Sequence, residues 1–155
     1  MMSGGKNNGT RKAKILVVED QAPVAMMMIY LLNHVGCETE TAWNGEKALQ
    51  MVQAENFDLI TLDVDMPGMN GYEICRRLKK DLRLRQTPVV FVSGRACDED
   101  RQHALELGAV DYIIKPFEAT DFIFRIVSHA KAKLLRSDVP DEKANTDAQS
   151  LCNTP

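Results

Sequence analysis

The chain lacks the cysteine pattern of a disulfide framework or a structural zinc site. Its four cysteines stand far apart, form no C-x-x-C pair and have no histidine at metal-ligand spacing. They are Cys37, Cys75, Cys97 and Cys152. We therefore expect reduced thiols, which argues against the class of small secreted proteins held together by disulfides.

A charge excess of one sign is also missing. The 155 residues include 19 Lys and Arg against 22 Asp and Glu, a net charge of -3, so no general field attracts nucleic acid or an anionic membrane. A local basic stretch spans residues 76–85, where a solvated helix face is favoured over a surface for an acidic partner or nucleic acid. Direct DNA binding is not expected, because no helix-turn-helix or zinc-finger segment is found.

Long hydrophobic runs are absent as well. The longest, residues 22–32, has 11 residues, well short of the roughly 20 that a transmembrane helix needs. We expect it to form a buried helix, with Met26, Met27 and Met28 as core filler. The N-terminus has no apolar segment typical of a signal peptide. These absences predict a cytoplasmic protein that does not associate with membranes.

What remains is an ordinary globular composition, 45% hydrophobic and 26% charged, enough for one domain with a sizeable core. Residues 1–12 are small, polar and basic, and residues 137–155 are polar with two prolines. Neither segment can bury enough apolar surface to offset the entropy of ordering. We predict disordered tails at 1–12 and 137–155 and one domain at 13–136.

Short apolar runs typical of strands alternate with helical patterns along this domain. The run at 37–42 alternates polar and apolar residues like an edge strand, and the others are nearly continuous, as in strands covered on both faces. The five runs are residues 14–19, 37–42, 57–63, 88–93 and 110–115. Strands alternating with helices predict βαβ units, hence a parallel sheet with helices on both faces.

Capping residues mark the ends of the intervening helices, the last of which is expected at about 118–135. Gly36 and Gly108 stand where helices commonly end. Asn44 and Asn70 can cap the helices that follow them, and Glu73 would complete a capping box with Asn70.

Polar side chains follow four of the five predicted strands. In a parallel sheet of this kind the ligand site lies at the carboxyl ends of the strands. Clustered carboxylates there would repel one another unless a cation neutralised them, and Mg²⁺ suits carboxylate and water ligands. The residues are Glu19 and Asp20, Asp63 and Asp65, Ser93, and Lys115.

Asp63 is the candidate nucleophile of this group. A carboxylate can accept a phosphoryl group where a metal ion, an ammonium and a hydroxyl stabilise the charge on the transferring oxygens. Four carboxylates would be balanced by one Mg²⁺, Lys115 and Arg95. Any one acidic strand end is commonly a solvated loop start, but their joint occurrence favours a reactive site.

These residues carry a family resemblance. The segments "ILVVED", "LITLDVDMPGMNG", "VVFVSG" and "GAVDYIIKPF" closely resemble the receiver domains of two-component response regulators, over about residues 13 to 135. The resemblance implies a stand-alone receiver domain at 13–136. Its expected fold is a flavodoxin-like, doubly wound α/β sheet of five parallel strands in the order 2-1-3-4-5. It also implies phosphorylation by a histidine kinase or a histidine phosphotransfer protein.

Carried over residue by residue, the resemblance makes Asp63 the phosphoacceptor. Asp20, Asp63 and the backbone carbonyl of Asp65 would bind Mg²⁺, and Glu19 would hold a metal-bound water. Phosphorylation would be a reaction of the chain on itself, followed by slow hydrolysis. We therefore do not expect an enzyme that turns over a separate substrate.

The resemblance also assigns a switch. Ser93 would bond the phosphoryl group, Lys115 would pair with it, and Pro116 would follow the lysine, often through a cis peptide. Tyr112 matches an aromatic position that would swing from an outward to an inward rotamer on phosphorylation. The surface of strand 110–115 and the helices flanking it would change, and would serve an unknown downstream protein or a homodimer.

Three residues beside the site are expected to tune the lifetime of the phosphorylated state. Asp65 and Arg95 carry opposite charges, and we predict that they pair across the mouth of the site and hinder hydrolytic water. Gly94 has no side chain and would leave the phosphodonor an open approach.

Two alternative functions stay open at the level of sequence. One is a receiver-fold interaction module that works without phosphorylation, although none of the expected site residues is missing. The other is an aspartyl phosphatase with a D-x-D motif, which the "DVD" of residues 63–65 fits. The cognate kinase and the downstream target cannot be read from the sequence.

Overall fold

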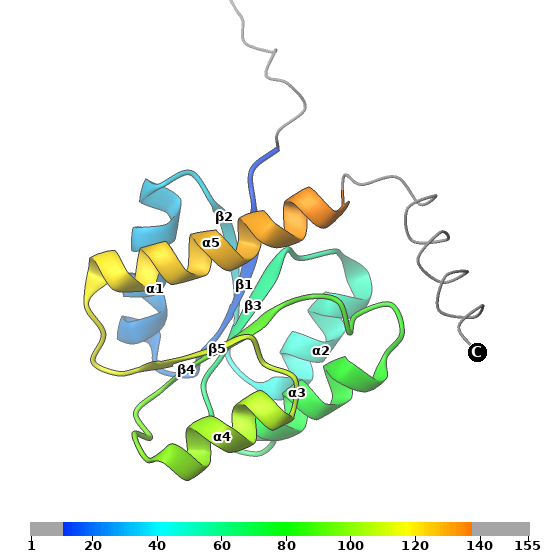
Figure 1. Ribbon diagram of the computed structural model, residues 1–155, viewed down its shortest axis with the longest axis vertical. Helices are drawn as coiled ribbons and strands as arrows, with labels where there is room; N and C mark the ends of the chain where they lie inside the picture. Colours follow the sequence, from blue (N-terminus) through cyan, green and yellow to red (C-terminus); the bar gives the residue numbers. More distant parts are fainter. Residues whose placement is uncertain (1–10, 138–155) are drawn as a thin grey trace, which may run out of the picture.

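The computed structural model describes residues 11–137 of the chain. Its parallel sheet has the strand order β2-β1-β3-β4-β5 (Figure 1). The strands are β1 (Lys14–Val18), β2 (Glu38–Ala42), β3 (Leu59–Leu62), β4 (Val89–Ser93) and β5 (Asp111–Ile114). The helices are α1 (Ala22–His34), α2 (Gly45–Ala54), α3 (Gly71–Lys80), α4 (Asp98–Glu106) and α5 (Ala119–Ser137). The predicted flavodoxin-like α/β fold is confirmed.

Two cores lie on opposite faces of the sheet. Helices α1 and α5 cover one face, and α2, α3 and α4 cover the other (Figure 1). Successive strand residues alternate between these cores, as in β1, where Ile15 and Val17 face α1 and α5 while Leu16 and Val18 face the other side. Burial on both faces explains why four of the strands read as nearly continuous apolar runs.

The predicted caps end or begin the helices as expected. The Oδ1 atoms of Asn44 and Asn70 accept hydrogen bonds from the backbone amides of Lys47, at 2.8 Å, and Glu73, at 3.0 Å. Gly36 and Gly108 have φ angles of 95° and 106°, which side chains disfavour.

The predicted capping box at α3 is wrong in one of its two contacts, the bond from the Asn70 backbone amide to the Glu73 side chain. The Glu73 carboxylate pairs with Arg76 and Arg77, three and four residues further along the helix. Two guanidinium groups on the same helix face offer charge-assisted bonds, which are stronger than a bond to a neutral backbone amide.

Helix α1 forms from the long apolar run, but only one of its three consecutive methionines fills the core. Met28 is 1% exposed, whereas Met26 is 66% and Met27 46% exposed. The prediction that all three are core filler is wrong, because a surface helix turns only one stripe of residues toward the sheet.

The domain boundaries fall close to the edges of the described part of the chain. Most of the predicted tails, residues 1–10 and 138–155, lie outside the described residues. Arg11, placed by prediction in the N-terminal tail, binds the buried Asp58 carboxylate through two bonds of 2.8 and 2.9 Å. Lys133 of α5 approaches the same carboxylate at 3.9 Å. Asp58 therefore secures both ends of the domain.

Much of the basic stretch at 76–85 is engaged within the chain. Lys79 donates to the backbone carbonyls of Arg85 and Thr87 at 3.1 and 3.0 Å. Arg83 donates to the carbonyl of Val52 at 2.8 Å.

No helix in the described part of the chain is both long and apolar enough to span a membrane.

Candidate functional site

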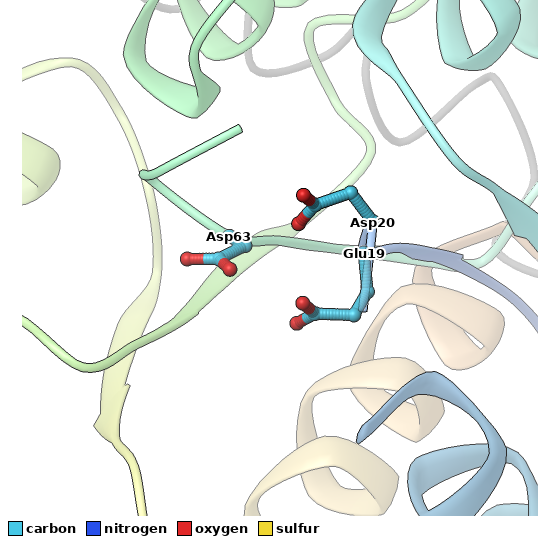
Figure 2. A group of neighbouring side chains, drawn as sticks. All are labelled: Glu19, Asp20 and Asp63. Carbon is cyan, nitrogen blue, oxygen red and sulfur yellow. The ribbon is translucent and has the colours of Figure 1, made fainter. Parts of the chain in front are cut away.

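An acidic cluster forms where β1 and β3 end. One carboxylate oxygen from each of Glu19, Asp20 and Asp63 lies within 4.8 Å of the others, and the three side chains project to the same side of the sheet edge (Figure 2). The cause is the register of the two neighbouring strands, in which Val18 stands opposite Leu62. The residues that follow these strands are therefore brought together, as the sequence predicted.

Trp43 follows β2, the strand that pairs with β1. The backbone amide of Glu19 donates to the carbonyl of Ala42 at 3.1 Å, and Trp43, the next residue, is 50% exposed. The chain contains no other tryptophan. Trp43 thus follows, in the chain, the residue whose carbonyl accepts from the Glu19 amide.

Lys115 brings a positive charge from the end of β5 into this cluster. Its Nζ donates to Glu19 Oε1 at 2.9 Å and to Asp63 Oδ2 at 3.0 Å. Burial alone would lower the pKa of Lys115, but the two carboxylates outweigh it and raise that pKa. Burial raises the pKa of Glu19, and the Lys115 ammonium opposes that rise. The Lys115–Pro116 peptide bond is cis, as the resemblance suggested.

The donor set fits a hard divalent cation. Glu19, Asp20 and Asp63 offer three carboxylates against the single ammonium of Lys115. Within residues 11–137, the buried Oδ1 of Asp20 has no hydrogen-bond partner, and an unpaired buried carboxylate oxygen is costly. Mg²⁺ prefers such oxygen ligands together with water. The residues present therefore fit the expected metal.

Ser93 ends β4 and is fully buried at the same edge of the sheet. Its Oγ accepts a hydrogen bond from the backbone amide of Arg95 at 3.1 Å. The hydroxyl therefore holds the turn that contains Gly94. A Cβ built on Gly94 would meet no atom within 4 Å, and the open approach for the phosphodonor stays a prediction.

Tyr112 occupies the inward position, although the outward rotamer was expected before phosphorylation. The residue is 3% exposed, its hydroxyl donates to the backbone carbonyl of Arg95 at 2.9 Å, and its ring stacks on Phe91 at 6.1 Å between centroids. A hydrogen-bond acceptor and an aromatic partner are already available inside, which explains this placement.

The predicted pairing of Arg95 with Asp65 is present. Both Nε and Nη2 of Arg95 donate to the Asp65 carboxylate, at distances of 2.7 to 3.1 Å. The hydrogen bonds to Asp65 hold the pKa of Arg95 above its ordinary value. Asp65 also donates its backbone amide to Asp63 Oδ1 at 3.2 Å, so the pair lies next to the candidate phosphoacceptor.

A contact network between α3 and α4 was not predicted from the sequence. The Tyr72 hydroxyl donates to Asp100 Oδ1 at 2.7 Å, and Arg95 Nη1 lies 3.5 Å from the same oxygen. Burial, and then the bond to Asp100, raise the pKa of Tyr72. No sequence motif marks this pair, because its members lie 28 residues apart and meet only through tertiary packing.

Comparisons with known proteins agree with this geometry. Residues 15–127 match the family model described as response regulator receiver domain. The chain is 38% identical over 117 residues to a probable transcriptional regulator, ycf27, of Cyanophora paradoxa, which covers 76% of this chain and 48% of that protein. It is 37% identical over 135 residues to the DNA-binding response regulator MtrA of Mycobacterium tuberculosis, covering 87% and 55%.

Solved structures show the same likeness. A putative response regulator from Chloroflexus aurantiacus superimposes with a TM-score of 0.75 at 29% sequence identity, over 78% of this chain and 99% of that one. The chain spans about half the length of the curated relatives it matches. With its sheet order, its clustered carboxylates and the matched family model, the chain belongs to the response regulator receiver domains of two-component systems.

Proposed function

We propose that this receiver domain is switched by phosphorylation of Asp63. The phosphoryl group would come from a histidine kinase or a histidine phosphotransfer protein in the cytoplasm. One observation supports this most directly, the contact of the Lys115 ammonium with both Glu19 and Asp63 beside an unpaired oxygen of Asp20. That arrangement supports the proposal, because a candidate acceptor carboxylate, a cation and a candidate metal-ligating oxygen lie within one small space.

The chemistry is a direct phosphoryl transfer. A carboxylate oxygen of Asp63 attacks the phosphorus, the bond between phosphorus and the donor imidazole nitrogen breaks, and an acyl phosphate forms. Lys115 lies at 3.0 Å from Asp63, so its ammonium can pair with the transferred phosphoryl oxygens. Asp20, Asp63 and the backbone carbonyl of Asp65 would hold Mg²⁺, which would further neutralise the phosphoryl charge. Glu19 would orient a metal-bound water.

Ser93 would convert the new charge into movement of the β4–α4 turn. Its hydroxyl now accepts from the Arg95 amide, but it can donate to a phosphoryl oxygen, and charge-assisted bonds are the stronger ones. Tyr112 would move with that turn because it is bonded to the Arg95 carbonyl. The shift in population can be no larger than the difference in these contacts between the two states.

The output surface would be made by α4, β5 and α5. Leu105, Val110 and Ile114 of this region are exposed, and Asp111 is held by Arg125 at 3.0 Å and by His129 at 3.1 Å. Apolar side chains beside charged pairs suit contact with a downstream protein or with a second copy of the chain. We propose output through such contact, without direct DNA binding by the described residues.

Intact-mass analysis would test this function. The full chain is incubated with Mg²⁺ and acetyl phosphate, alongside Asp63→Asn and the control Asp81→Asn, whose half-buried carboxylate lies in the turn after α3. The parent and the control should gain the mass of one phosphoryl group and Asp63→Asn should not. No gain in the parent, or equal labelling of Asp63→Asn, would contradict the proposal.

Assays for turnover of a phosphate ester would separate this function from the phosphatase alternative. We expect the chain to phosphorylate itself once and hydrolyse the acyl phosphate slowly. Repeated turnover of a small phosphate ester would instead indicate a phosphatase.

A further inference from the structure

Gly71, the first residue of α3, lies directly against the backbone of the phosphoacceptor. A Cβ atom built on Gly71 would stand 2.3 Å from the carbonyl oxygen of Asp63 and 2.9 Å from its carbonyl carbon. It would also stand 3.1 Å from a ring carbon of Phe91. The residue is buried, so no open space is available to relieve these contacts. Only a residue without a side chain fits between α3 and the end of β3.

The crowded atoms belong to the backbone, which cannot rotate away as a flexible side chain would. Ordinary van der Waals contact begins at 3.4 Å, against the 2.3 Å that a methyl group at Gly71 would have. Either the first turn of α3 or the peptide of Asp63 would therefore have to move by about 1 Å. By comparison, the three atoms nearest to a Cβ at Gly45 belong to the side chains of Met69 and Ile74, at 3.0 to 3.1 Å.

A second contact links Gly71 to the next peptide of the same loop. Its backbone amide donates to the carbonyl of Val64 at 3.0 Å. Gly71 therefore leaves the Asp63 carbonyl the space that a side chain would occupy, and its amide holds the Val64 carbonyl. The following residue is Asp65, whose carbonyl is an expected metal ligand, so this contact sets the path of the chain between both ligating residues.

We propose that Gly71 is a positioning residue for phosphorylation, setting the Asp63–Asp65 backbone at the geometry that Mg²⁺ and the phosphoryl group require. This inference rests on the proposed function. Mg²⁺ demands near-ideal octahedral geometry and short metal-oxygen distances, and a 1 Å misplacement of reacting groups can cost about a hundredfold in rate. A shift that the fold could absorb would therefore still impair the site.

The test compares Gly71→Ala with the matched control Gly45→Ala in the full chain. Three quantities are measured for each, namely the affinity for Mg²⁺ alone by calorimetry, the rate of phosphorylation by acetyl phosphate, and the urea midpoint of unfolding. We expect Gly71→Ala to lose tenfold or more, as an order of magnitude, in both Mg²⁺ affinity and phosphorylation rate. Gly45→Ala should lower the midpoint while its Mg²⁺ affinity stays within about twofold of the parent.

A double variant keeps the test decisive if Gly71→Ala fails to fold. Phe91→Leu in the Gly71→Ala background removes the ring carbon but leaves the clash with the Asp63 backbone. We expect this protein to fold and still to bind Mg²⁺ weakly. Recovery of parent-like Mg²⁺ affinity would overturn the positioning role. Unfolding of the double variant where Phe91→Leu alone stays folded would show that Gly71 serves the fold alone.

The remaining outcomes separate the inference from the function beneath it. If the parent neither binds Mg²⁺ nor becomes phosphorylated, the proposed function fails. If the parent does both and Gly71→Ala matches it, or Gly45→Ala loses as much Mg²⁺ affinity, only the inference about Gly71 fails.

Discussion

Arg95 pairs with Asp65 beside the acidic cluster, and two of its nitrogens donate to the one carboxylate at 2.7 to 3.1 Å. The two side chains come from the loops after β4 and β3, and are 48% and 57% exposed. They therefore form a cover that solvent can reach, next to the residue proposed to carry the phosphoryl group.

We predict that Arg95→Ala shortens the life of the acyl phosphate. An exposed ion pair contributes up to about 1 kcal/mol, so hydrolysis should accelerate by about fivefold at most. The measurement is loss of the phosphorylated mass with time after removal of the phosphodonor. Arg85→Ala, a change of the same charge in the exposed turn before β4, serves as control. Dephosphorylation of Arg95→Ala no faster than the parent would contradict the prediction.

Replacing Lys115 with glutamine should destabilise the metal-free protein. Lys115 is only 17% exposed and its removal leaves Glu19 and Asp63 without their shared cation, a loss of about 3 kcal/mol at neutral pH. Because the folded-state pKa of Lys115 is raised above 10.5, its contribution is full below that pH and disappears as pH rises through the folded-state value. Urea unfolding at neutral and alkaline pH measures the difference in free energy of unfolding between Lys115→Gln and the parent.

The control for that measurement is Lys47→Gln on the exposed side of α2. It should unfold like the parent at both pH values. If the difference in free energy of unfolding between Lys115→Gln and the parent stayed constant into the alkaline range, the lysine charge would not be the cause of the destabilisation.

Asp58→Asn should destabilise the protein at the amino ends of the strands, opposite the acidic cluster. Burial alone would raise the pKa of Asp58, but the bonds from Arg11 and from the Lys14 amide outweigh it and lower that pKa below 3.8. Its stabilising charge is therefore present above pH 3.8 and lost as pH falls through the folded-state value. We expect the free energy of unfolding of Asp58→Asn to be about 2 kcal/mol below that of the parent at neutral pH. This difference should disappear in acid. Urea unfolding against pH measures it, and a pH-independent difference would refute the mechanism.

Thr61→Val should stabilise the protein. Thr61 is 1% exposed in the middle of the sheet, and its hydroxyl has no hydrogen-bond partner in the part of the chain that the structure describes. Replacing an unpaired hydroxyl with a methyl group of similar shape removes a desolvation cost of about 1 kcal/mol. Thr41→Val on the edge strand β2, where the side chain is half-buried, should change the urea midpoint less. A lower midpoint for Thr61→Val would mean that the hydroxyl is satisfied.

The features that the sequence predicted are those set by local pattern. Strand positions followed from short apolar runs, and the caps at Asn44 and Asn70 from the side chains themselves. Bringing Glu19, Asp20 and Asp63 together required only that parallel strands end at one edge. The pair of Asp65 and Arg95 was predictable because both residues follow such strand ends.

Features set by packing between distant segments were missed. The inward placement of Tyr112 depends on the Arg95 carbonyl, and the salt bridge of Asp58 depends on a residue 47 positions away. The exposure of Met26 and Met27 depends on which side of α1 meets the sheet. Gly71 stands in a segment used for the resemblance, yet only the 2.3 Å approach to the Asp63 carbonyl shows why a side chain is excluded there.

The position of Trp43 gives the molecule an optical probe of its own chemistry. It is the chain's single tryptophan and is half exposed. It follows Ala42, whose carbonyl accepts a hydrogen bond from the Glu19 amide. Indole emission is sensitive to nearby charge and solvent, so fluorescence should follow metal loading and phosphorylation in real time without any added label. The unmodified chain is therefore suited to stopped-flow measurement of both steps, and mixing with Mg²⁺ before the phosphodonor is added separates the first step from the second.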